Sequence, residues 1–495
     1  MPEPTPLLTP PREAVEIIDR LLRSGRQAYL CGGCVRDALL GSAPKDYDIA
    51  TAATPDEVER LFPKTLPIGK AFGVILVEGT DGGHYEVATF RADHGYADGR
   101  RPDSVSFSSA EEDAKRRDFT MNALFYDTSQ DRVVDFVDGR ADIERRLLRT
   151  VGVPAERFGE DHLRLLRAVR FAARTGFKIE EETARAAAEM AGLVKTVSPE
   201  RIAAELESML TGGFSRPAFE MLSALNLLAA VLPEIEALKG VEQPPDFHPE
   251  GDVWIHTLML LEENDAAIRG ETPMVDFSAI ADVNPEKGMH RGDFTGDEYL
   301  EGVRETRQAL DATGVKIISW SGLLHDIGKP ATLTRSDRIR FNDHDRLGAE
   351  MASEVLERLR RPRRVVETVY NLIRRHIHFS TLRKMRKSKL RRWLASPDFP
   401  LHLELHRLDC LASHRMLANW YFGLQAWREE KALPPPLEPL LRGGDLLAMG
   451  IPAGPIIGVL LRQIEDARLE GAIQEPDQAR ELARHLYAHY QGGTT

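Results

Sequence analysis

The chain has 495 residues, of which 42% are hydrophobic and 29% are charged. This length is too great for a single hydrophobic core and predicts about three domains. The apolar run LLAAVL at 227–232 is far shorter than the roughly 18 residues that a membrane-spanning helix requires. With three cysteines and no basic start typical of a secretory signal, we expect reduced thiols, no membrane partner and a cytoplasmic location.

The formal net charge of −12 excludes a protein that is basic over its whole surface. Local basic runs remain, ERRLLRT at 144–150 and RKMRKSKLRRW at 383–393, and such runs can meet phosphate groups. The acidic bulk therefore weakens a nucleic-acid interpretation without excluding it.

The first predicted strand is AYLC, followed by Gly32, Gly33 and a helix over VRDALLG. Between a strand and a helix, a glycine pair lets backbone N–H groups face an anion, although a plain tight turn is the alternative. The same stretch contains a C-x-x-C, typical of thiol redox sites and zinc half-sites. A zinc site needs a second ligand pair, and the only other cysteine, Cys410, has no cysteine near it.

The segment DYDIA predicts the next strand, because Tyr47 and Ile49 alternate with polar residues. Residues two apart on a strand share a face, so we expect Asp46 and Asp48 to point to one side, about 7 Å apart at Cα. That spacing suits a pair of Mg²⁺ ions. A strand over HYEVATFR at 84–91 presents Glu86 as the best candidate for a third carboxylate. The alternative is that these acids are solvated charges at strand ends.

Six ordered motifs between residues 25 and 240 carry a family resemblance: GGCVRDALLG, KDYDIAT, YEVATFR, GRRPDSVSF, RRDFTMNAL and EDHLRLLRAVRFAAR. In this order they resemble class II nucleotidyltransferases of the polymerase beta superfamily. That group contains CCA-adding enzymes, their A-adding and CC-adding relatives, and bacterial poly(A) polymerases. The resemblance implies an α+β head with a small mixed sheet and helices, followed by an all-α neck and body.

The resemblance also implies roles for individual residues. Asp46, Asp48 and Glu86 would be catalytic, with Mg²⁺ held by Asp46 and Asp48. Arg117 would meet the triphosphate and Asp118 the ribose 2′-hydroxyl, so that NTP is preferred over dNTP. The whole implied nucleotide-binding set is Gly32, Gly33, Arg36, Arg117, Asp118, Asn122, Asp161, Arg164, Arg167 and Arg170.

The stretch EDHLRLLRAVRFAAR at 160–174 predicts an amphipathic helix with a basic stripe. Such a stripe is usually a solvated face. Here Asp161 and Arg164, three residues apart, offer an acceptor beside a forked donor on one helical face. Cytosine and adenine complement this pair, whereas uracil and guanine leave unpaired groups that cost on the order of 1 to 3 kcal/mol each. In the resembled family these positions act as an amino-acid template for the incoming base.

The second half of the chain is predicted to be almost entirely helical. GLLHDIGKP places His325 beside Asp326, with His256 upstream and Asp409 downstream in LELHRLDCLASH. This set resembles the HD phosphohydrolase superfamily, in which it binds a divalent metal. Imidazole and carboxylate ligands suit Mn²⁺, Ni²⁺, Fe or Mg²⁺. His344 and His376 stand where fuller HD sites recruit extra ligands.

Four regions are therefore expected: a nucleotidyltransferase head at 1–145, a neck and body at 146–245, an all-α HD domain at 246–430 and closing helices at 431–495. Within the third, the Gly-, Asp- and Pro-rich stretch at about 265–312 predicts a long inserted loop. RADHGYADGRRPDSVSF at 91–107 predicts a mobile loop.

Together these features predict a template-independent nucleotidyltransferase that adds CCA to tRNA 3′ ends from CTP and ATP, joined to an HD hydrolase domain. The alternatives within this class are A-only addition and a poly(A) polymerase. A pure HD hydrolase with an inert head is another enzyme interpretation, and an RNA-end-binding protein with decayed sites belongs to another class. The sequence assigns no oligomeric state.

Overall fold

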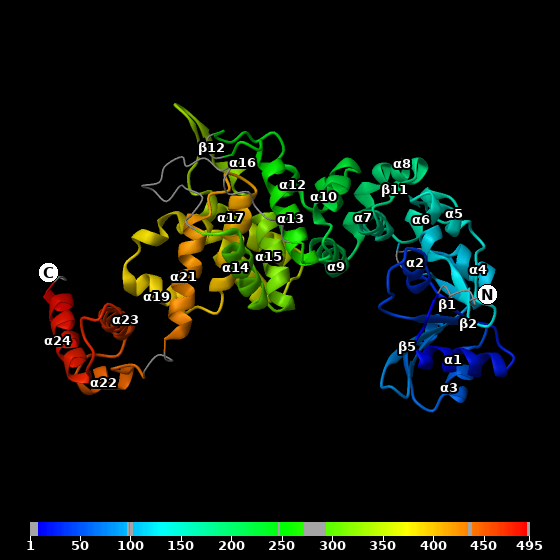
Figure 1. Cartoon of the computed structure of the whole chain (residues 1–495), viewed down its shortest axis with the longest axis horizontal. Coiled ribbons are helices and arrows are strands. Elements are labelled where there is room, and N and C mark those ends of the chain that lie inside the picture. Colours follow the sequence, from blue (N-terminus) through cyan, green and yellow to red (C-terminus); the bar gives the residue numbers. More distant parts are fainter. Residues whose placement is uncertain are drawn as a thin grey trace. The chain divides into compact units, whose positions relative to one another are not determined.

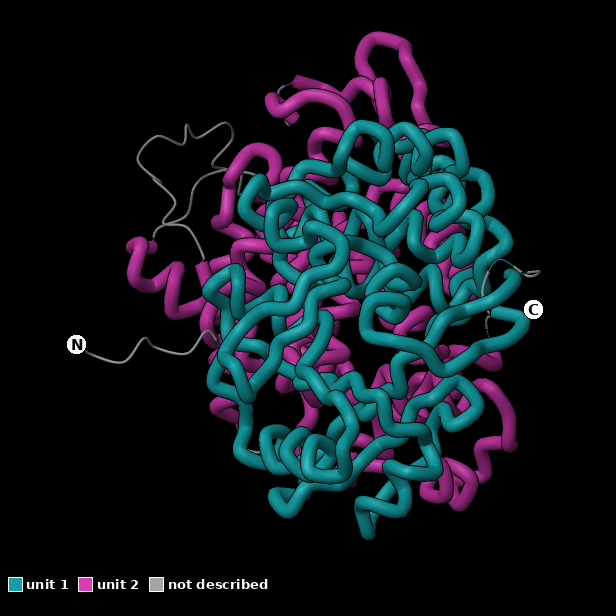
Figure 2. Tube along the Cα trace, turned by 90° about the vertical axis from the view of Figure 1, so that its right-hand side faces the viewer, with its two compact units in different colours: residues 1–237, 358–361 teal, residues 238–357, 362–495 magenta. Residues whose placement is uncertain are grey.

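The computed structural model of the chain describes residues 8–96, 99, 102–245, 248–271, 294–433 and 438–492. It divides into two compact units, which Figure 2 distinguishes by colour. Unit 1 comprises residues 1–237 and 358–361, and unit 2 comprises residues 238–357 and 362–495. No helix among the described residues has the length and apolarity to cross a membrane.

The head of unit 1 alternates short strands and helices, as predicted (Figure 1). Its elements are α1 (Arg12–Arg23), β1 (Ala28–Cys31), α2 (Gly33–Leu39), β2 (Asp48–Thr51), α3 (Pro55–Leu61), β3 (Thr65–Gly69), η1 (Lys70–Phe72), β4 (Val74–Glu78), β5 (His84–Thr89), β6 (Arg91–His94), β7 (Ser104–Phe107), α4 (Ala110–Lys115), η2 (Thr120–Asn122), β8 (Phe125–Asp127), β9 (Arg132–Val134) and α5 (Gly139–Glu144).

Seven of these strands form one mixed sheet in the order β3-β4-β5-β2-β1-β8-β9, in which only the β2–β5 pair is parallel. Alternate residues of the central strands face opposite sides. Helices α1 and α3 pack against one side of the central strands (Figure 1). Tyr29, Cys31 and Ala50 face the other side, where they join Phe90 and Phe125 in a buried cluster. The sheet thus has a core on both sides.

The rest of unit 1 is almost all helical. It contains β10 (Leu147–Leu148), α6 (Pro154–Glu160), α7 (Arg164–Thr175), β11 (Lys178–Ile179), α8 (Glu181–Glu189), η3 (Ala191–Thr196), α9 (Pro199–Leu210), α10 (Ser215–Ala224), α11 (Leu227–Val231) and α12 (Pro233–Glu236). Helix α7 ends at Gly176, whose φ of 67° is left-handed and favours glycine. Its apolar face is buried, which leaves the arginines on the opposite side.

Unit 2 is helical apart from one small hairpin. Its elements are α13 (Val253–Arg269), α14 (Gly296–Gln308), α15 (Ala312–Leu324), α16 (Lys329–Thr332), β12 (Leu333–Arg335), β13 (Ile339–Phe341), α17 (His344–Arg358), α18 (Arg363–Arg375), η6 (His376–Lys384), α19 (Lys387–Leu394), α20 (Phe399–Leu411), α21 (Ala418–Ala432), α22 (Gly443–Ala448), α23 (Pro455–Leu469) and α24 (Pro476–Gly492).

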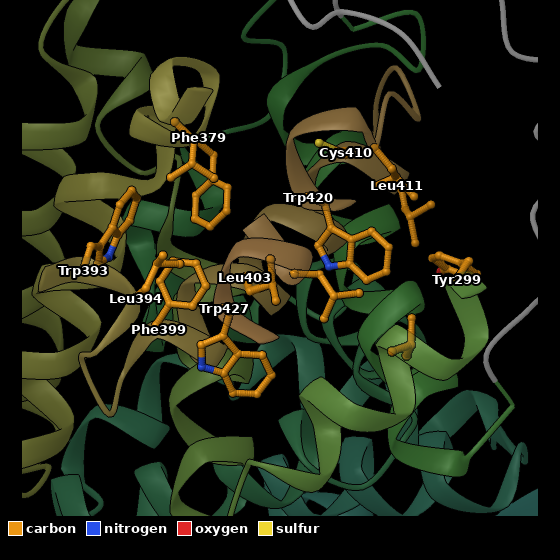
Figure 3. Packing of buried hydrophobic residues seen from close by; sticks show 14 residues of the cluster. Tyr299, Phe379, Trp393, Leu394, Phe399, Leu403, Cys410, Leu411, Trp420 and Trp427 are labelled. Atoms are coloured by element: carbon orange, nitrogen blue, oxygen red, sulfur yellow. The ribbon is translucent and has the colours of Figure 1, made fainter. Parts of the chain in front are cut away.

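An aromatic cluster forms one core of unit 2 (Figure 3). Trp393, Phe399, Trp420 and Trp427 come from α19, α20 and α21 and pack with Phe379 of η6. Phe379 and Trp393 meet edge to face with ring centroids 5.1 Å apart, a favoured geometry for aromatic pairs. The closing helices α22, α23 and α24 bury a separate aliphatic cluster.

Four local predictions were wrong. Strand β2 begins at Asp48, so Asp46 precedes it. Asp161 lies between α6 and α7 and shares no helical face with Arg164. The segment at 91–107 contains the paired strands β6 and β7, although its predicted central part includes residues outside the described set. The inserted loop expected at 265–312 is helical at both ends, because apolar residues of α13 and α14 are buried in unit 2. Residues 272–293 lie outside the described residues.

Candidate functional sites

Two carboxylates meet on the parallel strands β2 and β5. The register pairs Ala50 with Ala88, so the residues two positions earlier, Asp48 and Glu86, lie on neighbouring strands and on the same face. Asp46 stands two residues before Asp48 and is exposed. Burial, the charge of Glu86 and the charge of Asp46 raise the pKa of Asp48 to about 6 despite the opposing charge of Arg117. This mutual repulsion between carboxylates creates a site that suits a hard cation such as Mg²⁺.

The glycine turn lies beside this carboxylate. Asp48 is the strand partner of Cys31, which immediately precedes Gly32. Gly32 has φ 72°, and a Cβ there would approach Arg117 Nη1 to 3.1 Å, so both backbone and space require glycine. Gly33 begins α2, whose Arg36 donates to Asn122 Oδ1 at 2.6 Å.

The two neighbouring cysteines are part of the core. Cys34 donates its S–H to the carbonyl oxygen of Cys31, and both side chains are buried. Burial raises the pKa of the Cys34 thiol to about 12 and also raises that of Cys31. Both groups are therefore protonated near neutral pH, which argues against a redox or metal-binding role.

Charged pairs position the residues that resemble triphosphate and ribose ligands. Arg117 donates through Nε and Nη2 to Asp113 Oδ2, at 3.2 and 3.1 Å. Asp118 accepts two bonds from Arg167, at 3.0 and 2.7 Å, and one from Asn122 Nδ2 at 3.1 Å. Burial raises the pKa of Asp118, but Arg167 and Asn122 outweigh it and lower the pKa to about 2. Asp118 is therefore an acceptor at physiological pH.

Asp161 and Arg164 are held by other partners, not by each other's side chains. Asp161 accepts two bonds from Arg201 Nη2, at 3.2 and 2.9 Å. Arg164 donates to Glu160 Oε2 and to the carbonyl oxygen of Arg157. Fixed side chains lose little conformational freedom when they meet a ligand, so this arrangement is preorganised.

One pocket of about 540 Å³ brings these groups together. Its lining contains every residue predicted to bind nucleotide, together with Asp48: Gly32, Gly33, Arg36, Arg117, Asp118, Asn122, Asp161, Arg164, Arg167 and Arg170. Phe171 also lines the pocket, and the guanidinium groups of Arg36, Arg167 and Arg170 lie over its ring, with that of Arg170 4.1 Å from the ring centroid. The volume and the cationic lining suit a nucleoside triphosphate.

Several positioning residues were not predicted. Asp113 had a local signal, because an acid four residues before Arg117 on a helix can pair with it. Arg201 and Glu205 had none, since each pairs with a partner at least 35 residues away in sequence, Asp161 and Arg170 respectively. Arg116, Phe171 and Arg174 also line the pocket.

The second candidate site lies in unit 2 and gathers all six predicted HD residues. His256 comes from α13, His325 and Asp326 follow α15, His344 begins α17, His376 begins η6 and Asp409 lies on α20. The Nε2 atoms of His256 and His325 are 3.2 Å apart, and those of His344 and His376 are 3.3 Å apart. Asp409 Oδ1 lies 3.1 Å from His256 Nε2, and Asp326 Oδ2 lies 3.1 Å from His325 Nε2.

Every histidine in this cluster has its second ring nitrogen against an acceptor. The Nδ1 atoms of His325, His344 and His376 face the carbonyl oxygens of Gly322, Phe341 and Ile373 at 2.9, 2.7 and 2.6 Å. His256 Nδ1 faces Glu250 Oε1 at 2.8 Å. An Nδ1–H that donates to these acceptors leaves the Nε2 lone pair free, which is the tautomer that binds metals.

This donor set fits divalent metal. His256, His325 and Asp409 form one group whose ligand atoms lie within 4.8 Å of one another, and Asp326, His344 and His376 form another. Burial lowers the pKa of His256, but Asp409 and Glu250 outweigh burial and raise this pKa to about 9, so a metal that binds Nε2 near neutral pH would displace a proton from His256. Burial and the neighbouring histidines lower the pKa of His376 to about 4. Nitrogen and oxygen ligands in this number suit Mn²⁺, Ni²⁺, Fe or Mg²⁺ better than a metal that prefers thiolate.

A pocket of about 810 Å³ opens beside these ligands. It is lined by Asp326, His344, His376 and Asp409, and by His248, Lys329 and the β12–β13 hairpin residues Arg338 and Arg340. Apolar Ile339 and Phe341 complete one wall. Cationic groups and apolar surface beside metal ligands suit an organic phosphate ester.

Three family models match consecutive parts of the chain. The poly A polymerase head domain matches residues 28–149, and the probable RNA and SrmB-binding site of polymerase A matches residues 176–239. The HD domain matches residues 305–411. The first match covers the pocket residues from Gly32 to Asn122, whereas those from Asp161 to Arg174 lie between the first and second matches. The third match covers every predicted HD residue except His256.

Curated relatives carry the name CCA-adding enzyme. The protein from Bacillus licheniformis is 33% identical over 385 residues, which are 69% of this chain and 95% of the relative. The protein from Geobacillus kaustophilus is 49% identical over 226 residues, 45% of this chain and 55% of that relative. The chain spans only about half the length of several curated relatives that it matches, including this one.

Solved structures agree in fold. The CCA-adding enzyme of Bacillus stearothermophilus in complex with CTP superposes with a TM-score of 0.64 at 26% identity, covering 98% of this chain and all of that one. The Thermotoga maritima enzyme complexed with tRNA has a TM-score of 0.55 at 19% identity, covering 96% and 94% of the two chains, which shows the fold alone. The expected head, helical body and HD domain are thus confirmed as a fold class.

Proposed function

We propose, from the premise that the chain belongs to the CCA-adding enzyme family, that it adds cytidine and adenosine from CTP and ATP to the 3′ ends of tRNA without a nucleic-acid template. The observation that carries this proposal is the pocket of about 540 Å³ in unit 1, which we call the transferase pocket. In it, Asp48 lies beside the arginines of α2 and α7. A-only addition and poly(A) synthesis would use the same pocket. A cytoplasmic location stays a prediction.

Asp46, Asp48 and Glu86 are the residues that would hold Mg²⁺. Bound Mg²⁺ stabilises charge on the attacking and leaving oxygens in phosphoryl transfer. Arg117 and Arg36 would bind the phosphates of the nucleotide, while Asp118 accepts a hydrogen bond from the ribose. Because Arg167 and Asn122 keep Asp118 ionised and fixed in place, a ribonucleotide is preferred over its deoxy analogue.

Asp161 and Arg164 are proposed to select the base. The Asp161 carboxylate, held by Arg201, would accept from the exocyclic amino group of cytosine or adenine. Arg164 would donate to the neighbouring ring acceptor. A keto oxygen of uracil or guanine would instead face the carboxylate and leave it unpaired, at a cost of about 1 to 3 kcal/mol.

Transcripts that end before A, before CA and before CCA, each incubated with CTP or ATP alone, test this proposal. We expect CTP to extend the transcript lacking CCA by two nucleotides and the transcript lacking CA by one, and ATP to extend only the transcript lacking A, by one. Extension with ATP alone of every transcript would establish poly(A) synthesis. Incorporation of ATP without any incorporation of CTP would establish A-only addition.

A second function is proposed for unit 2, supported by the converging Nε2 atoms of the His/Asp cluster. We propose that this cluster binds a divalent metal and hydrolyses phosphate esters, such as 2′,3′-cyclic phosphates. The adjoining pocket supports an ester that carries an organic group, because Phe341 and Ile339 offer apolar contact beside the cationic side chains. Bound metal lowers the pKa of a coordinated water, and Lys329, 2.7 Å from Asp326, neutralises negative charge near it.

This second function is tested on purified parent protein. We expect hydrolysis of bis(p-nitrophenyl) phosphate or a 2′,3′-cyclic nucleotide with Mn²⁺, Ni²⁺ or Mg²⁺, and bound transition metal by elemental analysis. Metal bound without any hydrolysis would leave the cluster with a structural role only. If the protein contains no bound metal and shows no hydrolysis, the proposed site is refuted.

A further inference from the structure

The hairpin of β12 and β13 adds positive charge beside the HD cluster of unit 2 (Figure 1). Its strands pair antiparallel, and only two residues separate β13 from His344, which begins α17. The hairpin contains three arginines, Arg335, Arg338 and Arg340. Because His344 belongs to the HD cluster, the chain itself holds these charges close to the proposed metal ligands.

Two of the three arginines already have partners. Arg335 pairs with Glu242 at 3.1 Å. Arg340 donates to both carboxylate oxygens of Asp337, at 2.5 and 2.9 Å. Arg338 is exposed, and its side chain forms no ion pair or hydrogen bond within the described part of the chain. Of the charges on the hairpin, that of Arg338 is therefore available to a ligand.

Arg338 lines the pocket of about 810 Å³ beside the HD cluster, which we call the HD pocket. It precedes β13 by one residue, and a strand rises about 3.3 Å per residue, so its Cα lies about 10 Å from that of Phe341. Lys329, by contrast, lies next to the ligands, with Nζ 2.7 Å from Asp326 Oδ2 and 5.4 Å from the Phe341 ring centroid. The two cations therefore belong to different parts of the pocket lining.

Lys329 is held at the metal end of the HD pocket by a buried amide. Its Nζ donates to Gln243 Oε1 at 2.6 Å. Gln243 is only 5% exposed, and its Nε2 has no acceptor among the described residues. A buried donor without an acceptor, beside a fixed lysine, indicates that an anion's oxygen is the missing partner. One phosphate at this end would satisfy Lys329 and would leave Arg338 unused.

Apolar side chains make up much of the rest of the lining. Ile339, Phe341, Pro244 and Pro245 all contribute to it. Flat rings pack well against aromatic and proline surfaces. Asn342 also lines the pocket, and its amide offers both a donor and an acceptor to the edge of a base. Together with the pocket volume, this lining suits a nucleoside as the organic part of the ester.

We propose that Arg338 forms a second anion subsite in the HD pocket, so that unit 2 prefers a nucleotide with a further phosphate away from the scissile one. The proposal deepens the proposed hydrolysis of phosphate esters and rests on it. The scissile phosphate would lie by the metal ligands and Lys329, the nucleoside against Phe341, and the second phosphate at Arg338. A guanidinium group binds phosphate through two parallel N–H donors, so this subsite favours phosphate over a neutral hydroxyl.

Arg338→Gln in the full chain tests the subsite. The probes are adenosine 2′,3′-cyclic phosphate with and without a 5′-phosphate, in Mn²⁺. In each, the oxygen of water bonds to phosphorus, one ring P–O bond breaks and the departing ribose oxygen takes a proton. We expect the parent to prefer the 5′-phosphorylated ester about tenfold in kcat/KM, and the variant to lose this preference through KM. Bis(p-nitrophenyl) phosphate has no second anion, so both proteins should hydrolyse it equally.

Arg335→Gln is the matched control, because it removes an exposed arginine of the same hairpin that lies outside the lining of the HD pocket. Its preference for the 5′-phosphorylated ester should stay within about twofold of the parent, since exposed ion pairs contribute little. Arg338→Lys should keep most of the preference, because the positive charge remains.

A second measurement does not depend on turnover. In protein loaded with Co²⁺, the visible absorption of a metal bound by imidazole changes when a ligand reaches it, which confines the signal to the HD cluster. Adenosine 3′,5′-bisphosphate and adenosine 3′-phosphate are each titrated. We expect the parent to bind the bisphosphate roughly tenfold more tightly, and Arg338→Gln to bind the two alike.

An unchanged preference in Arg338→Gln would overturn the subsite, and so would an equal loss in Arg335→Gln. Hydrolysis of all three esters by a parent that shows no preference would refute the subsite alone. If the parent hydrolyses none of them, the proposed hydrolysis fails, and the Co²⁺ titration decides the subsite by itself. A protein that binds no Co²⁺ would refute both.

Discussion

The two candidate sites solve the problem of grouped charges in opposite ways. In the transferase pocket, cation and anion alternate: Asp118 binds Arg167, Asp161 binds Arg201, and Arg117 binds Asp113. In the HD cluster, four imidazole rings gather their Nε2 atoms around two carboxylates, and Lys329 supplies a permanent positive charge 2.7 Å from Asp326. The first site is largely satisfied by its own side chains, whereas the second needs a cation.

This difference has consequences for stability as well as for chemistry. A paired network keeps its geometry without ligand, so a ligand that binds there meets side chains that are already in place. A buried group of converging donors is stabilised when metal binds, because the ligand binds only the folded state. We therefore expect the stability of unit 2 to depend on transition metals more strongly than that of unit 1.

The largest effect is expected at the carboxylates of the transferase site, which, unlike the other charges there, are not paired with a cation among the described residues. Asp48→Ala should reduce nucleotide transfer by about 10³-fold or more, because metal stabilisation of the transition state is worth several kcal/mol. Binding of tRNA should persist, since no phosphate contact is removed. Single-turnover incorporation of CTP measures the loss, and Asp46→Ala should behave similarly.

Cys34→Ser is the matched control beside this carboxylate. Serine can keep the hydrogen bond to the Cys31 carbonyl, so transfer should change by less than about threefold. Strong loss in this variant would revive a thiol role. Full activity in Asp48→Ala would show that Asp48 is not a ligand of a catalytic metal.

The double substitution His325→Ala and Asp326→Ala breaks the HD cluster. It should abolish bound transition metal and phosphodiester hydrolysis, while nucleotide addition stays within about twofold of the parent, because the two sites belong to different compact units. Added Mn²⁺ should raise the thermal unfolding transition of unit 2 in the parent and should not raise it in the variant. Elemental analysis and calorimetry measure these effects.

His485→Ala, at an exposed histidine of α24, is the control for this variant and should keep both metal and hydrolysis. Joint loss of hydrolysis and nucleotide addition in the double variant, with native circular dichroism, would show that the two sites are coupled. The two sites would then not be independent of each other.

A smaller effect concerns base choice. Asp161→Ala should reduce discrimination between CTP and UTP by about 10- to 100-fold, corresponding to roughly 1 to 3 kcal/mol, while the affinity for the triphosphate changes little. Arg201→Ala should lower the same ratio less, because it frees the Asp161 carboxylate without removing it. The incorporation ratio in competition decides the matter. Slower turnover at an unchanged ratio would make Asp161 a structural partner of Arg201.

The smallest effect is a pH dependence of stability from Asp48. Its pKa is about 6 in the folded protein and about 3.8 when unfolded, so between these values the folded state binds more protons. Stability contributed by protonated Asp48 is present below about pH 4 and is lost as pH rises through about 6. Asp48 keeps an exposed side, so solvent screening will limit the size of the effect.

Asp48→Asn should therefore raise the melting temperature of unit 1 relative to the parent at pH 7.5, in chelator, and should not raise it at pH 4.5. Adding Mg²⁺ at pH 7.5 should narrow this difference by stabilising the parent. If the melting temperatures of Asp48→Asn and the parent differ equally at both pH values, repulsion between the carboxylates is not the cause of the difference.

The sequence by itself named the candidate residues of both sites. Strand alternation put Asp46 and Asp48 forward and named Glu86 as a candidate third carboxylate, and the glycine pair marked the turn in which Gly32 has a left-handed φ. The histidine spacing named all six members of the HD cluster. The strand and glycine signals are local, since they depend on residue type and on a period of two residues, whereas the HD residues were named from their resemblance to a known superfamily.

Tertiary structure decided what holds each group in place. Arg201 reaches Asp161 across 40 residues, and Glu205 reaches Arg170 across 35, so no local period reveals either pair. The placement of Asp161 outside α7 was decided by packing at the α6–α7 junction, which the basic stripe alone could not show. Glu250 meets His256 only because the chain folds back at the start of α13. Long-range ion pairs and ring orientations depend on three-dimensional packing, and for that reason one sequence names the ligands of a site but not the side chains that orient them.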